Sequence, residues 1–159
     1  MKVRRLLDQI SEKLSIFIIG LMVILVVWQV VSRYVFKTPV PWSEQLAKYL
    51  FVWLVLINGA YMFGKKGHMN ISFFKGLMPQ KIQQILDYVV QIAVLLFAAG
   101  ILLIGGYMAL KVGIPQRDAA LTISMGYVYA ALPISGILTC FYSICNLTDM
   151  ARAGNKRRR

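Results

Sequence analysis

The chain is predicted to be an all-α integral membrane protein, with four transmembrane helices, amphipathic interfacial helices and both termini in the cytoplasm. Three observations predict this fold: the composition, the charge-free stretches and the distribution of cations. Of the 159 residues, 58% are hydrophobic and 15% are charged. Soluble chains are about 45–50% apolar and about 25% charged. The apolar excess must face lipid, so we expect one membrane domain over residues 1–159.

The net charge of +12 does not indicate a nucleic-acid partner. The lysines and arginines lie between and outside the apolar stretches, where membrane topology places them. With four spans, 13 of the 18 cations fall on the side of the two termini, and 5 fall on the other side. The termini are therefore predicted to be cytoplasmic. The basic tail at 148–159 is expected to contact anionic lipid.

Residues 1–14 are predicted to form an interfacial helix, followed by a first span at 14–36. In the first segment, apolar residues share one helical face and charged residues lie off it, as in helices that lie on a membrane surface. Residues 14–32 carry no charge over 19 residues, and a helix of that length measures about 28 Å. Gln29 is expected to make an interhelical or headgroup hydrogen bond.

The second span is predicted at 41–64. It begins after Pro39 or at Pro41, because proline is favoured in the first turn of a helix. Glu44 then lies where the helix dipole favours a carboxylate, with Lys48 at i+4. Residues 66–78 are too short and polar to span, so they are predicted to form a second interfacial segment. His68, the single histidine, lies at its entrance.

The third and fourth spans are predicted at 80–110, with a polar lead-in, and at 124–147. Gly105 and Ala109 form a small-xxx-small pair, which is expected to allow close helix approach within ordinary bundle packing. Pro133 lies inside the fourth span and is expected to kink it.

No catalytic or metal-binding pattern is found in the chain. The deep parts of the four spans contain no ionisable side chain, although ion-coupled transporters usually keep one within the bilayer. Cys140 and Cys145 are about 140° apart on a helix and cannot pair with each other. They are expected to be small buried hydrophobes. We therefore predict no enzyme, no cofactor and no transport by this chain alone.

Several motifs together resemble a known family. They are RYVF at 33–36, WSEQLAKY at 42–49, GA at 59–60, HMNI at 68–71, LMP at 77–79, and SMGY at 124–127 with Tyr129 and LP at 132–133. In this order and spacing they resemble the DctQ-type small membrane subunit of tripartite ATP-independent periplasmic (TRAP) transporters, in its unfused form. Many members carry a second acidic residue after the position of Glu44, where this chain has Gln45. No role is assigned to Gln45 on that basis.

The resemblance implies a subunit of the bacterial inner membrane with two protein partners. A large elevator-type subunit on a separate chain would hold the sodium and substrate sites. A periplasmic protein would capture an organic acid, such as sialic acid or a C4-dicarboxylate. The small subunit would scaffold the large one and help to dock the periplasmic protein. The alternative is a self-contained dimeric proton-coupled multidrug exporter, and the missing mid-span carboxylate argues against it. A redox or quinone-linked anchor is more remote, because one histidine cannot hold a bis-histidine haem.

The candidate site residues lie at the predicted outer ends of the spans. Those expected to contact the large subunit are Trp42, Ser43, Glu44, Tyr49 and Trp53. Those expected at lipid headgroups are Arg33, Lys37 and Lys48, and those in a loop that can touch the periplasmic protein are Arg117 and Asp118. For Glu44 the alternative is a structural first-turn carboxylate paired with Lys48, and for Trp42 a membrane-belt tryptophan. For Arg117 and Asp118 the alternative is a solvated loop.

Overall fold

The structure, a computed structural model, describes residues 2–38, 40–64 and 80–156. Its helices are α1 (Lys2–Tyr34), α2 (Pro41–Gly64), α4 (Gln80–Phe97), the π-helix η2 (Ala98–Gly105), α5 (Gly106–Gly113), α6 (Gly126–Tyr129) and α7 (Ala131–Lys156). Four stretches of the described chain are long and apolar enough to cross a membrane, namely Arg4–Tyr34, Pro41–Gly64, Ile85–Gly113 and Gly126–Met150. This confirms the predicted class of a four-span, all-α membrane protein.

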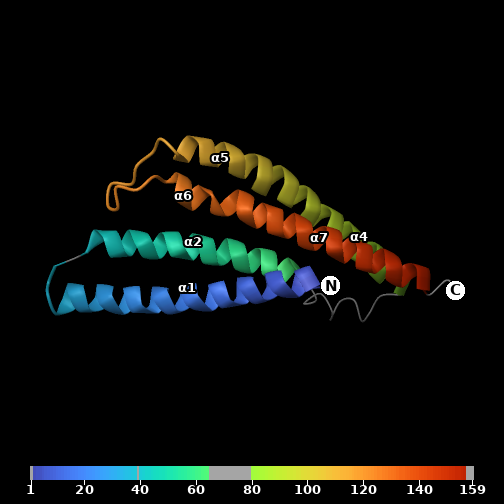
Figure 1. Cartoon of the computed structure of the whole chain (residues 1–159), viewed down its shortest axis with the longest axis horizontal. Helices are drawn as coiled ribbons and strands as arrows, with labels where there is room; N and C mark the ends of the chain where they lie inside the picture. Colours follow the sequence, from blue (N-terminus) through green and yellow to red (C-terminus); the bar gives the residue numbers. More distant parts are fainter. Residues whose placement is uncertain (1, 39, 65–79, 157–159) are drawn as a thin grey trace.

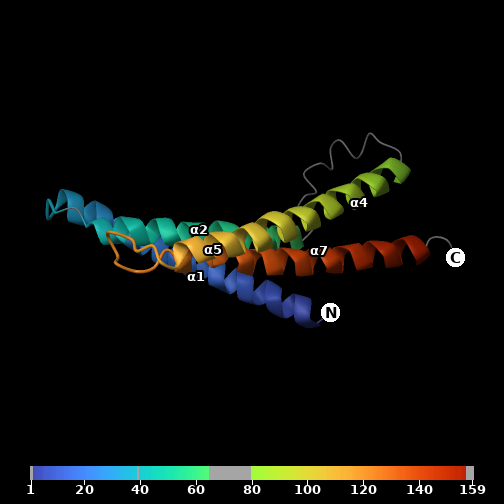
Figure 2. The ribbon, with the colours of Figure 1, turned by 90° about the horizontal axis from the view of Figure 1, so that it is seen from above.

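The helices form a row in which α1 packs on α2, α2 on α7, and α7 on the continuous α4–η2–α5 helix (Figure 1). The fourth span is the most buried of the four, with 39% of its apolar stretch buried, against 11–17% for the others. Seen from above, α1 and α4 leave the α2–α7 pair on opposite sides (Figure 2). Most apolar side chains therefore face outward, toward lipid or a partner.

Both described chain ends lie at one end of the row, opposite the α1–α2 turn and the α5–α6 loop (Figure 1). We call the end with the turn (35–40) and the loop (114–125) the turn end, and the other the terminal end. The charge count predicts that the turn end faces the periplasm. That orientation stays a prediction.

The expected break near residue 14 is wrong, because α1 is a single helix of 33 residues. No glycine or proline lies between Lys2 and Gly20 to interrupt it. Its charged side chains are also used inside the molecule. Asp8 accepts a hydrogen bond from Tyr142 Oη (2.8 Å) and Glu12 accepts one from Tyr61 Oη (3.3 Å). The first fourteen residues thus extend the first span and join it to its neighbours.

Another boundary also differs from prediction. The last helix continues to Lys156, so most of the predicted tail at 148–159 is helical. The fourth span is interrupted inside its predicted bounds, at Ala130 between α6 and α7, three residues before Pro133. Pro133 has no N–H to donate to the carbonyl of the residue four positions earlier, so the interruption falls where a proline is expected to disturb a helix. The predicted interfacial segment at 66–78, with His68, lies outside the described residues.

Close helix packing occurs one residue away from the predicted pair. A Cβ added to Gly106 would lie 2.9 Å from Leu132 Cβ and 3.0 Å from the Pro133 nitrogen. A Cβ on Gly105 would meet only a carbonyl of its own helix, at 3.9 Å. The cause is η2, because a π-helix has more residues per turn and shifts the packed face of everything after it. Sequence periodicity at 3.6 residues cannot show that shift.

Gly106→Ala is therefore expected to destabilise the fold by about 1–3 kcal/mol, because the added methyl group overpacks the contact with α7. Gly105→Ala is the matched control, and it should be neutral or slightly stabilising because alanine favours helix over glycine. Thermal unfolding of both variants in detergent tests this. Equal melting temperatures would show that the contact at Gly106 is not tight.

Candidate functional site

The start of α2 separates the predicted contact residues into exposed and buried ones. Trp42 and Glu44 are exposed, with Trp42 44% accessible. Ser43 is fully buried, and its Oγ donates to the Val40 carbonyl oxygen (2.9 Å). The Ser43 carbonyl accepts a hydrogen bond from Gln29 Nε2 (3.0 Å), which is the interhelical alternative expected for Gln29. Ser43 thus fixes the helix start on α1, whereas its two neighbours are exposed.

Glu44 forms an exposed ion pair with Lys48. The Lys48 Nζ to Glu44 Oε1 distance is 2.9 Å, with both side chains more than half accessible. An exposed pair at i,i+4 contributes only about 0.3–0.5 kcal/mol. The pair does explain how a carboxylate is held at this helix start without a bound ion.

Asp118 is the best-connected acidic group at the turn end. Its Oδ2 accepts hydrogen bonds from Tyr49 Oη (2.6 Å) and Gln45 Nε2 (2.8 Å) on α2. Its Oδ1 accepts the backbone amides of Ala120 (2.8 Å) and Leu121 (2.9 Å). The residue is buried, so the expectation of an exposed loop charge is wrong. We call Asp118, Gln45 and Tyr49 the Asp118 clamp.

The clamp favours the ionised carboxylate. The Tyr49 hydroxyl, followed by the Leu121 amide, lowers the pKa of Asp118 below its ordinary 3.8. Since folding lowers this pKa, the clamp contributes stability above pH 3.8, which is lost only as pH falls through the lower folded value. The loop is therefore held throughout the neutral and mildly acidic range.

Further bonds close the loop on itself and join α6 to α2. The Asp118 amide donates to the Ile123 carbonyl (3.0 Å), and the Met125 amide donates to the Gln116 carbonyl (2.9 Å). Trp53 Nε1 donates to the Tyr127 carbonyl oxygen (3.2 Å). Tyr49 thus holds the loop and Trp53 holds the following helix α6, whereas Arg117 stays exposed on the loop.

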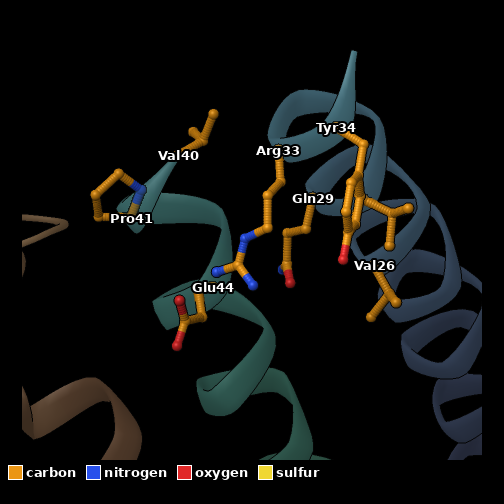
Figure 3. Close-up of a pocket in the computed structure, with 8 residues that line it drawn as sticks. Val26, Gln29, Arg33, Tyr34, Val40, Pro41 and Glu44 are labelled. Carbon is orange, nitrogen blue, oxygen red and sulfur yellow. The ribbon is translucent and has the colours of Figure 1, made fainter. Parts of the chain in front are cut away.

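A pocket of about 480 Å³ opens between α1 and α2 at the turn end (Figure 3). Its lining residues are Val26, Gln29, Val30, Arg33, Tyr34, Val40, Pro41 and Glu44. Arg33 extends from α1 into the gap, and Glu44 stands on the opposite wall (Figure 3). Of the three predicted headgroup residues, only Arg33 lines this pocket. Lys37 lies in the turn with a φ of 54°, and Lys48 pairs with Glu44.

A second polar network lies at the terminal end and was not predicted from the sequence. Arg4 donates to Asp149 Oδ2 (3.2 Å), to Asn146 Oδ1 (3.1 Å) and to the Gly64 carbonyl. Asn146 Nδ2 in turn donates to the Phe63 carbonyl oxygen (3.0 Å). The network joins the ends of α1, α2 and α7. Opposite charges at the ends of the first and last spans, on one side of the membrane, were the available signal.

No group of three or more histidine, cysteine or acidic side chains that can hold a metal ion is found within the described ranges. Cys140 and Cys145 are free and partly accessible, so the expectation that they are buried is wrong. The turn end presents an exposed tryptophan, an exposed ion pair, a fixed loop and a pocket.

The family model described as "Tripartite ATP-independent periplasmic transporters, DctQ component" matches residues 22–153. The chain belongs to the DctQ family. It is 28% identical over 154 residues to the sialic acid TRAP transporter small permease protein SiaQ of Vibrio cholerae, covering 94% of this chain and 86% of that protein. It is 34% identical over 140 residues to the sialic acid TRAP transporter permease protein SiaT of Haemophilus influenzae, covering 87% of this chain but 22% of that protein.

A third relative is the C4-dicarboxylate TRAP transporter small permease protein DctQ of Vibrio cholerae. It is 26% identical over 106 residues, which cover 67% of this chain and 45% of that protein. The matches confirm the resemblance drawn from the motifs. The chain described here is thus a small permease subunit of a TRAP transporter in the inner membrane. Its relatives are transporter subunits and not enzymes.

Tyr49→Phe tests the Asp118 clamp in this DctQ subunit. Removing one hydroxyl should raise amide hydrogen exchange at Ala120 and Leu121 by about five- to tenfold, because one hydrogen bond contributes about 1 kcal/mol. Tyr127→Phe is the matched control, because Tyr127 is 70% accessible and takes part through its backbone. Unchanged exchange in Tyr49→Phe would contradict the clamp.

Proposed function

We propose that this subunit is a non-catalytic scaffold for a larger, sodium-coupled, elevator-type membrane subunit that transports an organic acid. The names of the relatives support sialic acid or a C4-dicarboxylate as the substrate class. One observation carries the proposal: residues 14–32, 49–64, 88–110 and 124–148 contain no ionisable acidic, basic or histidine side chain. Ion and substrate pathways across membranes usually need such groups. The substrate and sodium sites therefore belong to the partner.

The arrangement of the helices supports a role as a fixed scaffold for another subunit. The row leaves apolar side chains exposed on both outer helices, such as Ile16, Phe17 and Ile24 on α1 and Leu96 and Met108 on α4 and α5. Such faces fit lipid on one side and a partner's helices on another. Because polar bonds join the helices at both ends, the row can act as a fixed part against which another subunit moves.

The exposed residues at the turn end are the proposed contacts. Trp42 and Glu44 would meet the large subunit, with Ser43, Tyr49 and Trp53 positioning them and the loop from behind. Arg117, exposed on the fixed loop, would meet the periplasmic protein. Asp118 would act through the loop, as a positioning residue, since it is buried.

The purified chain in liposomes is expected to move no labelled sialic acid or C4-dicarboxylate under a sodium gradient, because it lacks a polar path. Uptake should require the large subunit and the periplasmic protein together. Substrate movement by this chain alone would contradict the scaffold role. Proton-coupled efflux that Glu44→Gln abolishes would instead support the small exporter.

The double variant Trp42→Ala and Glu44→Ala is expected to weaken co-purification with the large subunit, because both side chains are exposed at the proposed contact. Membrane insertion should stay normal. Trp28→Ala is the control, since Trp28 is similarly accessible (47%) but lies on α1. A loss of about tenfold in affinity is expected for an interface tryptophan. Wild-type co-purification would remove Trp42 and Glu44 from the interface.

A further inference from the structure

We propose that the groove between α1 and α2 binds one phospholipid with a phosphoethanolamine headgroup. The site is formed by this chain alone. It has two parts, the pocket at the turn end and an adjoining apolar groove of about 350 Å³. Val26 lines both, so the two parts adjoin at this residue of α1.

The headgroup part contains a cation whose side chain forms no direct bond with the protein. The Arg33 side chain makes no hydrogen bond and no ion pair with any residue in the described part of the chain, and its charge acts on Glu44 only electrostatically, across the pocket. Its guanidinium lies in the gap between the helices (Figure 3). A guanidinium is suited to two parallel hydrogen bonds with a phosphate. Its position at the end of a span is the level of lipid phosphates.

The opposite wall favours a zwitterion over an anion. Glu44 lines the pocket from α2, and Gln29 lines it from α1. The Gln29 amide nitrogen is already bonded to the Ser43 carbonyl, so its own carbonyl oxygen is the group left for a ligand. An ethanolamine ammonium can donate to both acceptors, whereas a choline group has no N–H to donate. A headgroup with only negative charge would place that charge near Glu44.

The tail part is apolar throughout. Its lining residues are Ile19, Met22, Val23, Val26, Val27, Phe51 and Leu54, contributed by α1 and α2. The groove therefore changes from charged at the turn end to apolar toward the middle of the span. A free ion does not have that distribution, but a diacyl phospholipid does. The apolar part would hold one acyl chain along the helix pair.

The test uses the full-length chain, delipidated in detergent and titrated with phosphatidylethanolamine, phosphatidylcholine and phosphatidylglycerol of equal acyl chains. Native mass spectrometry reads the bound lipid. Wild type should bind the ethanolamine lipid most tightly. Arg33→Gln should weaken that binding by at least about fivefold, since one charge-assisted contact is lost. Lys37→Gln is the matched control, because Lys37 is an exposed cation nearby that does not line the pocket.

A second pair of variants tests the continuity of the groove. Val26→Trp should block the junction and abolish tight binding, whereas Ile24→Trp should not, because Ile24 is exposed on α1 outside both linings. Equal affinity in Arg33→Gln and Lys37→Gln, or phosphatidylglycerol bound as tightly as phosphatidylethanolamine, would overturn the proposal. So would a lipid-free dimer that Val26→Trp dissociates, because the groove would then hold a second copy.

Discussion

Hydrocarbon cannot accept or donate hydrogen bonds, and this constraint determines where the chain makes its specific contacts. The strongest polar bonds between helices lie at the two ends, where water and headgroups begin. At the turn end, the carboxylate of Asp118 joins α2 to the α5–α6 loop. At the terminal end, Arg4 joins α1 to the ends of α2 and α7. Between the ends, the helices are held mainly by packing, with one hydrogen bond from Ser15 Oγ to Asn58 Oδ1 (3.2 Å). Small residues such as Gly106 and Gly136 set how closely the helices approach.

The fourth span carries both kinds of contact, which explains its central place. Its buried face has small polar residues whose hydroxyls bond within the helix, as Ser135 Oγ does with the Leu132 carbonyl (2.8 Å) and Thr139 Oγ1 with the Ser135 carbonyl (2.8 Å). Such side chains need no partner across the interface. Close approach follows, and Gly64 of α2 lies so near the Tyr142 ring that an added Cβ would be 2.6 Å away.

Length, hydropathy and charge were enough to predict the four spans, because lipid imposes those properties on any chain that crosses it. The start of α2 and the Glu44–Lys48 pair were also predictable, since both depend on neighbours within four residues. The Asp118 clamp was not, because Gln45, Tyr49 and Asp118 are brought together only by the fold, and a loop aspartate normally indicates exposure. The π-helix could not be predicted from the sequence either. The predicted position of close helix packing, Gly105, is therefore one residue before the observed one, Gly106. That residues 1–14 continue the helix of the first span was not predictable, because an amphipathic pattern does not distinguish a lipid surface from the polar side chains of neighbouring helices.

The position of α1 connects the lipid site with the scaffold role. It is an outer helix and packs mainly on α2. Its polar attachments lie mostly in its first half, through Arg4, Asp8, Glu12 and Ser15. At the turn end it has the Gln29 contact with the Ser43 carbonyl. Along the middle, the α1–α2 seam opens into the apolar groove, where protein atoms alone leave space.

An outer helix that separated from its neighbour would be a poor part of a fixed frame. A phospholipid held by Arg33 would fill that seam with a ligand that the membrane supplies at high concentration, and binding to the folded state alone stabilises it. In this arrangement the lipid is a component of the frame, and the rigidity of α1 depends on the headgroups available to Arg33.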